Sequence, residues 1–132
     1  MTRVWMVRIL EREEFCFRNN TVAIGWAYAR GLDRPDLIWE QFKAVVQAAY
    51  PDYRSPYALG QAAGVMWRFI RDIRLDDWII APTWTGLNLA RVSGPLLYDE
   101  ARIDDDCAWR YPVRWIRRDV PRDSASYPLQ AR

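Results

Sequence analysis

The side chains that most often carry chemistry are scarce in this chain. Of its 132 residues none is histidine, two are cysteines (Cys16 and Cys107), and Lys43 is the one lysine among 19 basic residues. Without histidine there is no Ser-His-Asp triad, no Cys-His pair and no His-ligated metal site. Two cysteines are too few for a four-cysteine zinc site, and their separation fits either two free thiols or one long-range bridge. We favour free thiols and expect no enzymatic activity, metal or cofactor.

Two short patterns could indicate a nuclease active site or a cation site. Gln41-Phe42-Lys43 superficially fits the Gln-x-Lys element of metal-dependent nucleases. It falls inside an amphipathic helix whose Phe42 is expected to face the core, so we predict no catalysis there. The run Asp104-Asp105-Asp106 lacks the spaced carboxylates and the glycine of a calcium loop, and we interpret it as a solvated acidic loop.

Aromatic and guanidinium groups, by contrast, are abundant. The chain has eight Trp, seven Tyr and four Phe, and its net charge is +2. Residues 99–106 are strongly acidic and residues 108–132 are basic, while the rest is near balance. The chain is therefore not a polycation, and any contact with nucleic acid must be a local patch. The preference for Arg over Lys fits either a GC-rich genome or phosphate recognition, since a guanidinium binds oxyanions in a bidentate way.

The N-terminal half that must position these groups is predicted to contain three strands and one helix. The runs typical of strands are Val4–Leu10, Phe15–Phe17 and Thr21–Tyr28. Asn19-Asn20 indicates a turn. Asp33 is a suitable N-cap and Pro35 suits a first turn, so the apolar spacing predicts a helix over Arg34–Ala49.

The C-terminal half is predicted to contain a second helix, Tyr57–Ile73, followed by strands. A hairpin with Thr85-Gly86 at its tip is expected to join the first two of these strands. The predicted strands are Trp78–Pro82, Leu87–Val92, Leu96–Tyr98 and Val113–Ile116, with Trp109–Pro112 leading into the last. About six short strands around two helices predict one α+β domain with a curved, barrel-like sheet.

No segment has the length and composition of a membrane span. The longest uncharged stretch, Trp78 to Ala90, has 13 residues, which is short of the roughly 20 apolar residues that cross a bilayer. The N-terminus lacks the apolar region of a signal peptide. We therefore expect a cytoplasmic protein.

Three segments carry a resemblance to a known family. They are Ala23-Ile24-Gly25-Trp26 before the Asp-capped helix, Gly64–Ile70 with Asp77–Ile80, and Tyr111–Trp115 leading to Asp119–Asp123. In this order they resemble the N-terminal domain of Mrr-type restriction endonucleases, over about residues 3–126. The Val-x-Trp strand with its Asp-Val-Pro turn, and the Gly25-Trp26 pair, are also similar to segments of YTH domains. YTH and EVE domains belong to the PUA-like superfamily, whose members read modified bases.

The resemblance implies a PUA-like reader domain over residues 1–126 and a tail over residues 127–132. It implies a pseudo-barrel that binds double-stranded DNA and accepts one flipped, methylated or otherwise modified base between aromatic side chains. Such a domain supplies specificity to a restriction or defence system, and any nuclease activity would lie on another domain or chain. Extruding a base costs about a few kcal/mol, and aromatic stacking returns about 1–3 kcal/mol per base.

Carried over residue by residue, the resemblance makes Trp26 the first candidate for the aromatic pocket. Trp109 and Trp84 are the two candidates for the second wall, and Tyr28 and Asp33 are expected at the mouth. Core packing is the alternative role for Trp26 and Trp109. The other tryptophans lie within predicted helices or strands, and we assign them to the core: Trp5, Trp39, Trp67, Trp78 and Trp115.

Five arginines, four of them near the last strand, are candidates for contact with the nucleic-acid backbone. The full set is Arg30, Arg110, Arg114, Arg117 and Arg118. A solvated face is the alternative for these residues. Two further functions remain open: a YTH-like reader of methylated RNA, and a domain that binds a small ligand or another protein.

Overall fold

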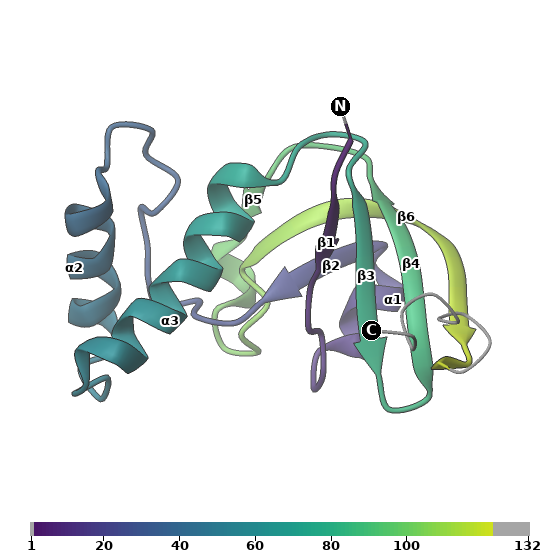
Figure 1. The fold of residues 1–132 in the computed structure, drawn as a ribbon, viewed down its shortest axis with the longest axis horizontal. Coiled ribbons are helices and arrows are strands. Elements are labelled where there is room, and N and C mark those ends of the chain that lie inside the picture. The colour runs from purple at the N-terminus through teal and green to yellow at the C-terminus, as the bar shows by residue number, and fades with distance from the viewer. Residues whose placement is uncertain (1, 123–132) are drawn as a thin grey trace.

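Six strands form one strongly curved sheet in the computed structural model, which describes residues 2–122 (Figure 1). The strands are β1 (Val4–Met6), β2 (Thr21–Ile24), β3 (Trp78–Thr83), β4 (Gly86–Val92), β5 (Leu97–Tyr98) and β6 (Trp109–Val120). Their order across the sheet is β1-β3-β4-β6-β2, with β5 also paired to β6. β1 and β3 are parallel, and the other pairs are antiparallel.

The curvature of the sheet comes from β6, which pairs with different strands along its length. Residues 109–112 of β6 pair with β2, and residues 113–120 pair with β4. Register shifts interrupt the β4–β6 ladder between Leu87 and Ala90, and such bulges bend a strand and increase its twist. β6 therefore arches from one part of the sheet to the other and gives it the form of a half-barrel (Figure 1).

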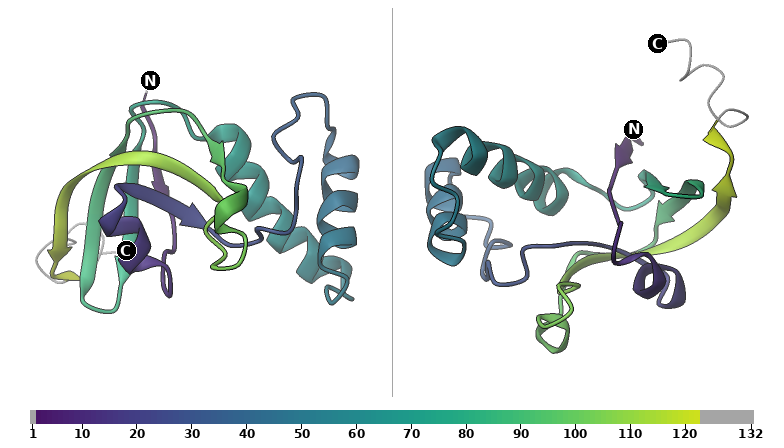
Figure 2. Two further views of the ribbon diagram at one scale, coloured as in Figure 1. Left: turned by 180° about the vertical axis from the view of Figure 1, so that it is seen from behind. Right: turned by 90° about the horizontal axis from the view of Figure 1, so that it is seen from below.

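The helices lie on two sides of this sheet. They are α1 (Glu13–Arg18), α2 (Trp39–Ala49) and α3 (Pro56–Trp67), which a π-helical turn η1 (Arg68–Asp72) continues, and a 3-10 turn η2 (Glu100–Arg102). α2 and α3 pack together beside one end of the half-barrel (Figure 2), with the ring of Trp67 5.4 Å from Trp39 and 5.1 Å from Phe42. α1 packs under β6, where the Trp115 indole donates to the Cys16 carbonyl at 3.2 Å.

The α+β class and the curved sheet are confirmed, and so are the second helix and the β3–β4 hairpin. Both cysteines are free, as expected, and both are buried. Burial raises the pKa of Cys16 to about 12 and that of Cys107 to about 11, so neither thiol is a nucleophile at neutral pH. Among residues 2–122, no helix has the length and apolar character needed to cross a bilayer.

The strand expected over Phe15–Phe17 is wrong, because these residues lie in α1. Alternation over three residues is too short to separate a strand from a helix. In the helix, Cys16 is buried, while Phe17 packs edge-on against Trp115 at 4.8 Å. Two acidic residues in the first turn and Arg18 in the last suit the helix dipole.

The first long helix begins at Trp39 and not at Arg34, and Asp33 does not cap it. The Arg71 guanidinium donates to the carbonyls of Arg34 and Pro35 at 2.7 and 3.4 Å, which holds this segment outside the helix. Ile38 is the N-cap residue, and its N–H donates to the Gln41 side chain at 3.1 Å.

Other boundaries also differ from the expected ones. β1 ends at Met6, β2 ends at Ile24, and the tip of the β3–β4 hairpin is Trp84-Thr85 and not Thr85-Gly86. The last strand is much longer than Val113–Ile116, since β6 continues to Val120. The tail expected at 127–132 lies outside the described residues.

Candidate functional site

A cavity of about 480 Å³ lies where β1, the end of β2 and the α3–η1 segment meet. This volume is in the range of small-molecule sites, about 300–1,000 Å³. The side chains that line it are mostly apolar or aromatic, together with three arginines. The lining residues are Trp5, Met6, Val7, Arg8, Arg12, Ile24, Trp26, Val65, Arg68, Phe69 and Ile73.

Two tryptophans in this lining are held in fixed orientations by their indole N–H groups. The Trp26 indole donates to the Tyr53 hydroxyl at 2.8 Å, and the Trp5 indole donates to an Asp77 carboxylate oxygen at 2.9 Å. Because both N–H groups already have acceptors, the ring surfaces are what these residues offer to a ligand. A flat aromatic ligand suits such walls, since stacking uses ring surface and not the N–H group.

The Asp77 carboxylate that orients Trp5 is itself buried. It also accepts the backbone N–H groups of Arg3 at 3.0 Å and Arg74 at 2.8 Å. Burial alone would raise the pKa of Asp77, but these hydrogen bonds, the Trp5 bond and the Arg3 charge outweigh it and lower the pKa. Asp77 therefore stays ionised. Its hydrogen bonds connect the start of β3 to β1 and to Trp5, which forms one wall of the cavity.

Trp26 reaches the cavity from a tight turn that an acidic residue supports. Its φ is 64°, an unusual value for a large residue and one that directs the chain out of β2. The Asp106 carboxylate accepts the Ala27 N–H at 2.9 Å and lies against Gly25, where a Cβ would come within 2.6 Å of its Oδ2. The Gly25-Trp26 pair is thus explained, because only glycine leaves room for this carboxylate.

Replacing Gly25 by alanine is expected to destabilise the fold by about 1–2 kcal/mol, because the new methyl group displaces Asp106 from the Ala27 N–H. Chemical denaturation measures the change. Gly60→Ala is the matched control, since a Cβ at Gly60 in α3 meets no atom within 4 Å, and alanine favours a helix over glycine. Equal stability of Gly25→Ala and the native chain would contradict this account of the turn.

The three arginines of the cavity differ in exposure and in pairing. Arg8 and Arg68 are exposed, and their guanidinium groups make no ion pair or hydrogen bond with residues 2–122. Arg12 has a side chain that is 20% exposed, and its Nη1 lies 3.8 Å from the Asp106 Oδ2. Within the described part of the chain no acidic side chain lines this cavity. The cavity therefore favours a ligand with anionic or acceptor groups.

Of the five residues expected to form the pocket, the structure places only Trp26 in this cavity. Trp109 is fully buried, donates to the Ala29 carbonyl at 3.0 Å and packs on Tyr98, so we correct its role to core packing. Trp84 is 86% exposed at the hairpin tip. Tyr28 is 61% exposed beside Tyr50, and Asp33 is exposed in the turn before α2.

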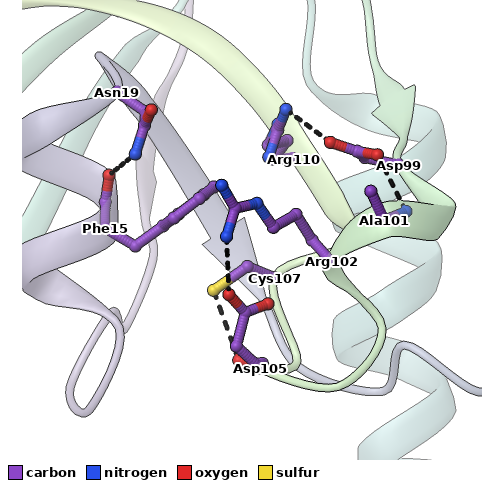
Figure 3. Close-up of polar contacts among 8 residues, drawn as sticks. All are labelled: Phe15, Asn19, Asp99, Ala101, Arg102, Asp105, Cys107 and Arg110. Atoms are coloured by element: carbon purple, nitrogen blue, oxygen red, sulfur yellow. Dashed lines mark hydrogen bonds and ion pairs between the residues drawn. The ribbon is translucent and has the colours of Figure 1, made fainter.

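The arginines expected to contact phosphate divide into paired and unpaired groups. Arg30 lies 3.6 Å from Glu100, and Arg110 donates to Asp99 at 2.9 Å (Figure 3). Arg118 packs over the ring of Phe17. Arg114 and Arg117 are exposed on β6 and make no ion pair or side-chain hydrogen bond with residues 2–122. Of the five expected arginines, these two therefore have a guanidinium without a partner within the described residues.

The acidic segment after β5 is held in place by hydrogen bonds and by ion pairs with arginine side chains (Figure 3). Asp99 caps η2 through the Ala101 N–H at 3.0 Å, and Arg102 pairs with Asp105 at 3.2 Å. The guanidinium groups of Arg102 and Arg110 lie 5.0 and 5.1 Å from the centre of the Phe15 ring. Over residues 2–122, no group of three or more His, Cys, Asp or Glu side chains is arranged to hold a metal.

Sequence reasoning missed the partners of Trp26 in the cavity. Trp5 was expected in the core, and Arg8, Arg12 and Arg68 were not expected at the site. Contacts between segments far apart in the sequence place these residues: β1 pairs with β3, and Arg12 lies 3.8 Å from Asp106, which supports the Gly25-Trp26 turn. The one local signal is the density of arginine around Trp5, at positions 3, 8 and 12.

Comparison with known proteins gives one match. A family model described as "Domain of unknown function (DUF8426)" matches residues 6–131. No curated protein and no solved structure matches the chain.

Proposed function

The chain belongs to the DUF8426 family of unknown function, and from its cavity we propose that it reads a modified base in double-stranded DNA. The flipped base stacks against Trp5 and Trp26, and the resemblance to PUA-like readers of the EVE and YTH kind implies this role for Trp26. The curved half-barrel with an aromatic cavity at one end supports this assignment. The domain acts as the specificity module of a restriction or defence system, and cleavage belongs to a separate nuclease domain or chain.

The observation that carries the proposal is the pair of oriented tryptophans in a cavity with three arginines and no acidic lining residue within 2–122. Extruding a base costs a few kcal/mol, and stacking on an aromatic wall returns about 1–3 kcal/mol per base. Two walls therefore offset the cost of extrusion. A methyl group on the base adds roughly 0.8 kcal/mol when it is buried.

Phosphate contacts supply the rest of the affinity. Arg8 and Arg68 are exposed beside the cavity and suit the phosphates that flank an extruded nucleotide. Arg114 and Arg117 on β6 offer a further contact to the duplex. Each phosphate that an arginine neutralises releases counterions, so the affinity should fall steeply as salt is raised.

Titration of matched duplexes tests the proposal. The chain is titrated with fluorescent duplexes of one sequence in which a single base is unmodified, methylated, or carries a larger substituent. We expect at least one modified duplex to bind several-fold more tightly than the unmodified one, with affinity falling as salt rises. Equal binding of all duplexes, or no binding at low salt, would contradict the proposal.

Two further arms separate the alternative functions. A single-stranded RNA with the same modified base tests the YTH-like alternative, because the 2′-OH distinguishes the two backbones. A free modified nucleoside tests whether the cavity serves a small ligand. Preference for RNA, or binding of the nucleoside as tight as that of the duplex, would favour those alternatives over a DNA reader.

A further inference from the structure

Arg12 lines the cavity and has a buried side-chain donor without a hydrogen-bond partner among residues 2–122. Four buried side-chain nitrogen or oxygen atoms of residues 2–122 have no hydrogen-bond partner, and they belong to Arg12, Glu13, Arg71 and Arg110. Arg12 is the one of these residues that lines the cavity. Its Nε is the unpartnered atom.

The rest of the Arg12 guanidinium is also poorly satisfied. Its Nη1 lies 3.8 Å from the Asp106 Oδ2, which is too long for a hydrogen bond. The Asp106 Oδ1 instead accepts a hydrogen bond from the Ala27 N–H at 2.9 Å. A guanidinium has five N–H donors, so Arg12 retains several for a ligand.

We infer that Arg12 determines specificity and that the cavity selects a base whose modifying group is an oxyanion, such as a carboxylate. This inference rests on the proposed function and names the chemical class of the modification. Arg8 and Arg68, which are exposed, bind phosphates, whereas Arg12, which is largely buried, binds the modifying group.

The reason is the cost of covering Arg12 with a ligand that cannot pair with it. A stacked base displaces water from the cavity. Arg12, whose carboxylate partner Asp106 lies 3.8 Å away, would then keep N–H groups without an acceptor, which is unfavourable. An unmodified or methylated base offers only neutral acceptors, whereas a carboxylate accepts the same N–H groups and also carries the opposite charge. A planar carboxylate also accepts two parallel N–H groups from one guanidinium.

The test compares three duplexes that differ only in one cytosine, which is unmodified, methylated at C5 or carboxylated at C5. We expect the native chain to bind the carboxylated duplex about tenfold or more tightly than the methylated one. Arg12→Gln should remove this preference while binding to the methylated duplex remains. Arg12→Lys should restore part of the preference through its charge.

Arg8→Gln is the matched control, because Arg8 lines the same cavity but is exposed. It should weaken binding of all three duplexes by a similar factor and leave the preference intact. Thermal unfolding of each variant shows whether it is folded. If Arg12→Gln does not fold, the comparison of Arg12→Lys with the native chain still tests the inference.

The outcomes separate this inference from the proposed function. Tighter binding of the methylated than of the carboxylated duplex would overturn the inference and leave the reader function standing. An unchanged preference in folded Arg12→Gln or Arg12→Lys would also overturn it. Identical binding of all three duplexes would overturn both. Binding of free carboxylated deoxycytidine as tight as that of the duplex would support the oxyanion site and contradict the DNA reader.

Discussion

Trp26→Ala is expected to lower the affinity for the preferred modified duplex by about 5- to 150-fold, because it removes one stacking wall worth about 1–3 kcal/mol. The loss should be much smaller for unmodified duplex bound through phosphates alone. The positive φ of Trp26 is not a new strain for alanine, since the native residue already carries it. Fluorescence anisotropy at fixed salt measures both affinities.

Two further variants separate the role of Trp26 in stacking from the general effect of removing a tryptophan. Trp26→Phe keeps a ring but loses the hydrogen bond to Tyr53, so it should retain part of the selectivity. Trp84 is exposed at the hairpin tip and lies outside the cavity, so Trp84→Ala should leave selectivity unchanged. Full selectivity in a folded Trp26→Ala variant would remove Trp26 from the site.

Asp77→Asn is expected to destabilise the fold by about 3 kcal/mol, a large fraction of the 5–15 kcal/mol that keeps a domain folded. The native carboxylate accepts two backbone N–H groups and the Trp5 indole. An amide has one acceptor oxygen and turns its NH₂ group toward donors, so buried donors lose their partner. Denaturant titration measures the free energy of unfolding of both chains.

The pH dependence of this difference has a definite sign. The pKa of Asp77 is lower in the folded chain than its ordinary value of 3.8. A lowered pKa stabilises the fold above the unfolded value, and that stabilisation disappears as the pH falls through the folded one. The gap between native and Asp77→Asn stability should therefore be constant near neutral pH and narrow below about pH 4. A gap that widens in acid would contradict the ionised state of Asp77.

Much of the fold follows from local patterns in the sequence. The helix over α3 and η1 has a Ser55 N-cap and a proline in its first turn, and the β3–β4 hairpin alternates buried and half-buried residues. Such signals act over a few residues, so sequence reasoning can find them. The α2 boundary was missed because Arg71, from a distant helix, binds the carbonyls of Arg34 and Pro35.

The candidate site was harder to predict, because its parts come from segments far apart in the sequence. Trp26 was identified from its place after Gly25, and it lines the cavity. Trp109 has the same residue type, but it lies on the face of β6 that alternates into the core. Arg12 could not be predicted, since nothing local distinguishes it from the other arginines.

The double pairing of β6 also constrains how the chain folds during synthesis. β2 emerges from the ribosome early, but its partner residues 109–112 are made almost 90 residues later, as the gap of 90 between Thr21 and Tyr111 shows. β4 likewise waits for the second half of β6. Until then β2 is an unpaired edge, which is prone to wrong association. We therefore expect the half-barrel to close late in synthesis, and nascent chains that stop before Trp109 to need chaperone protection.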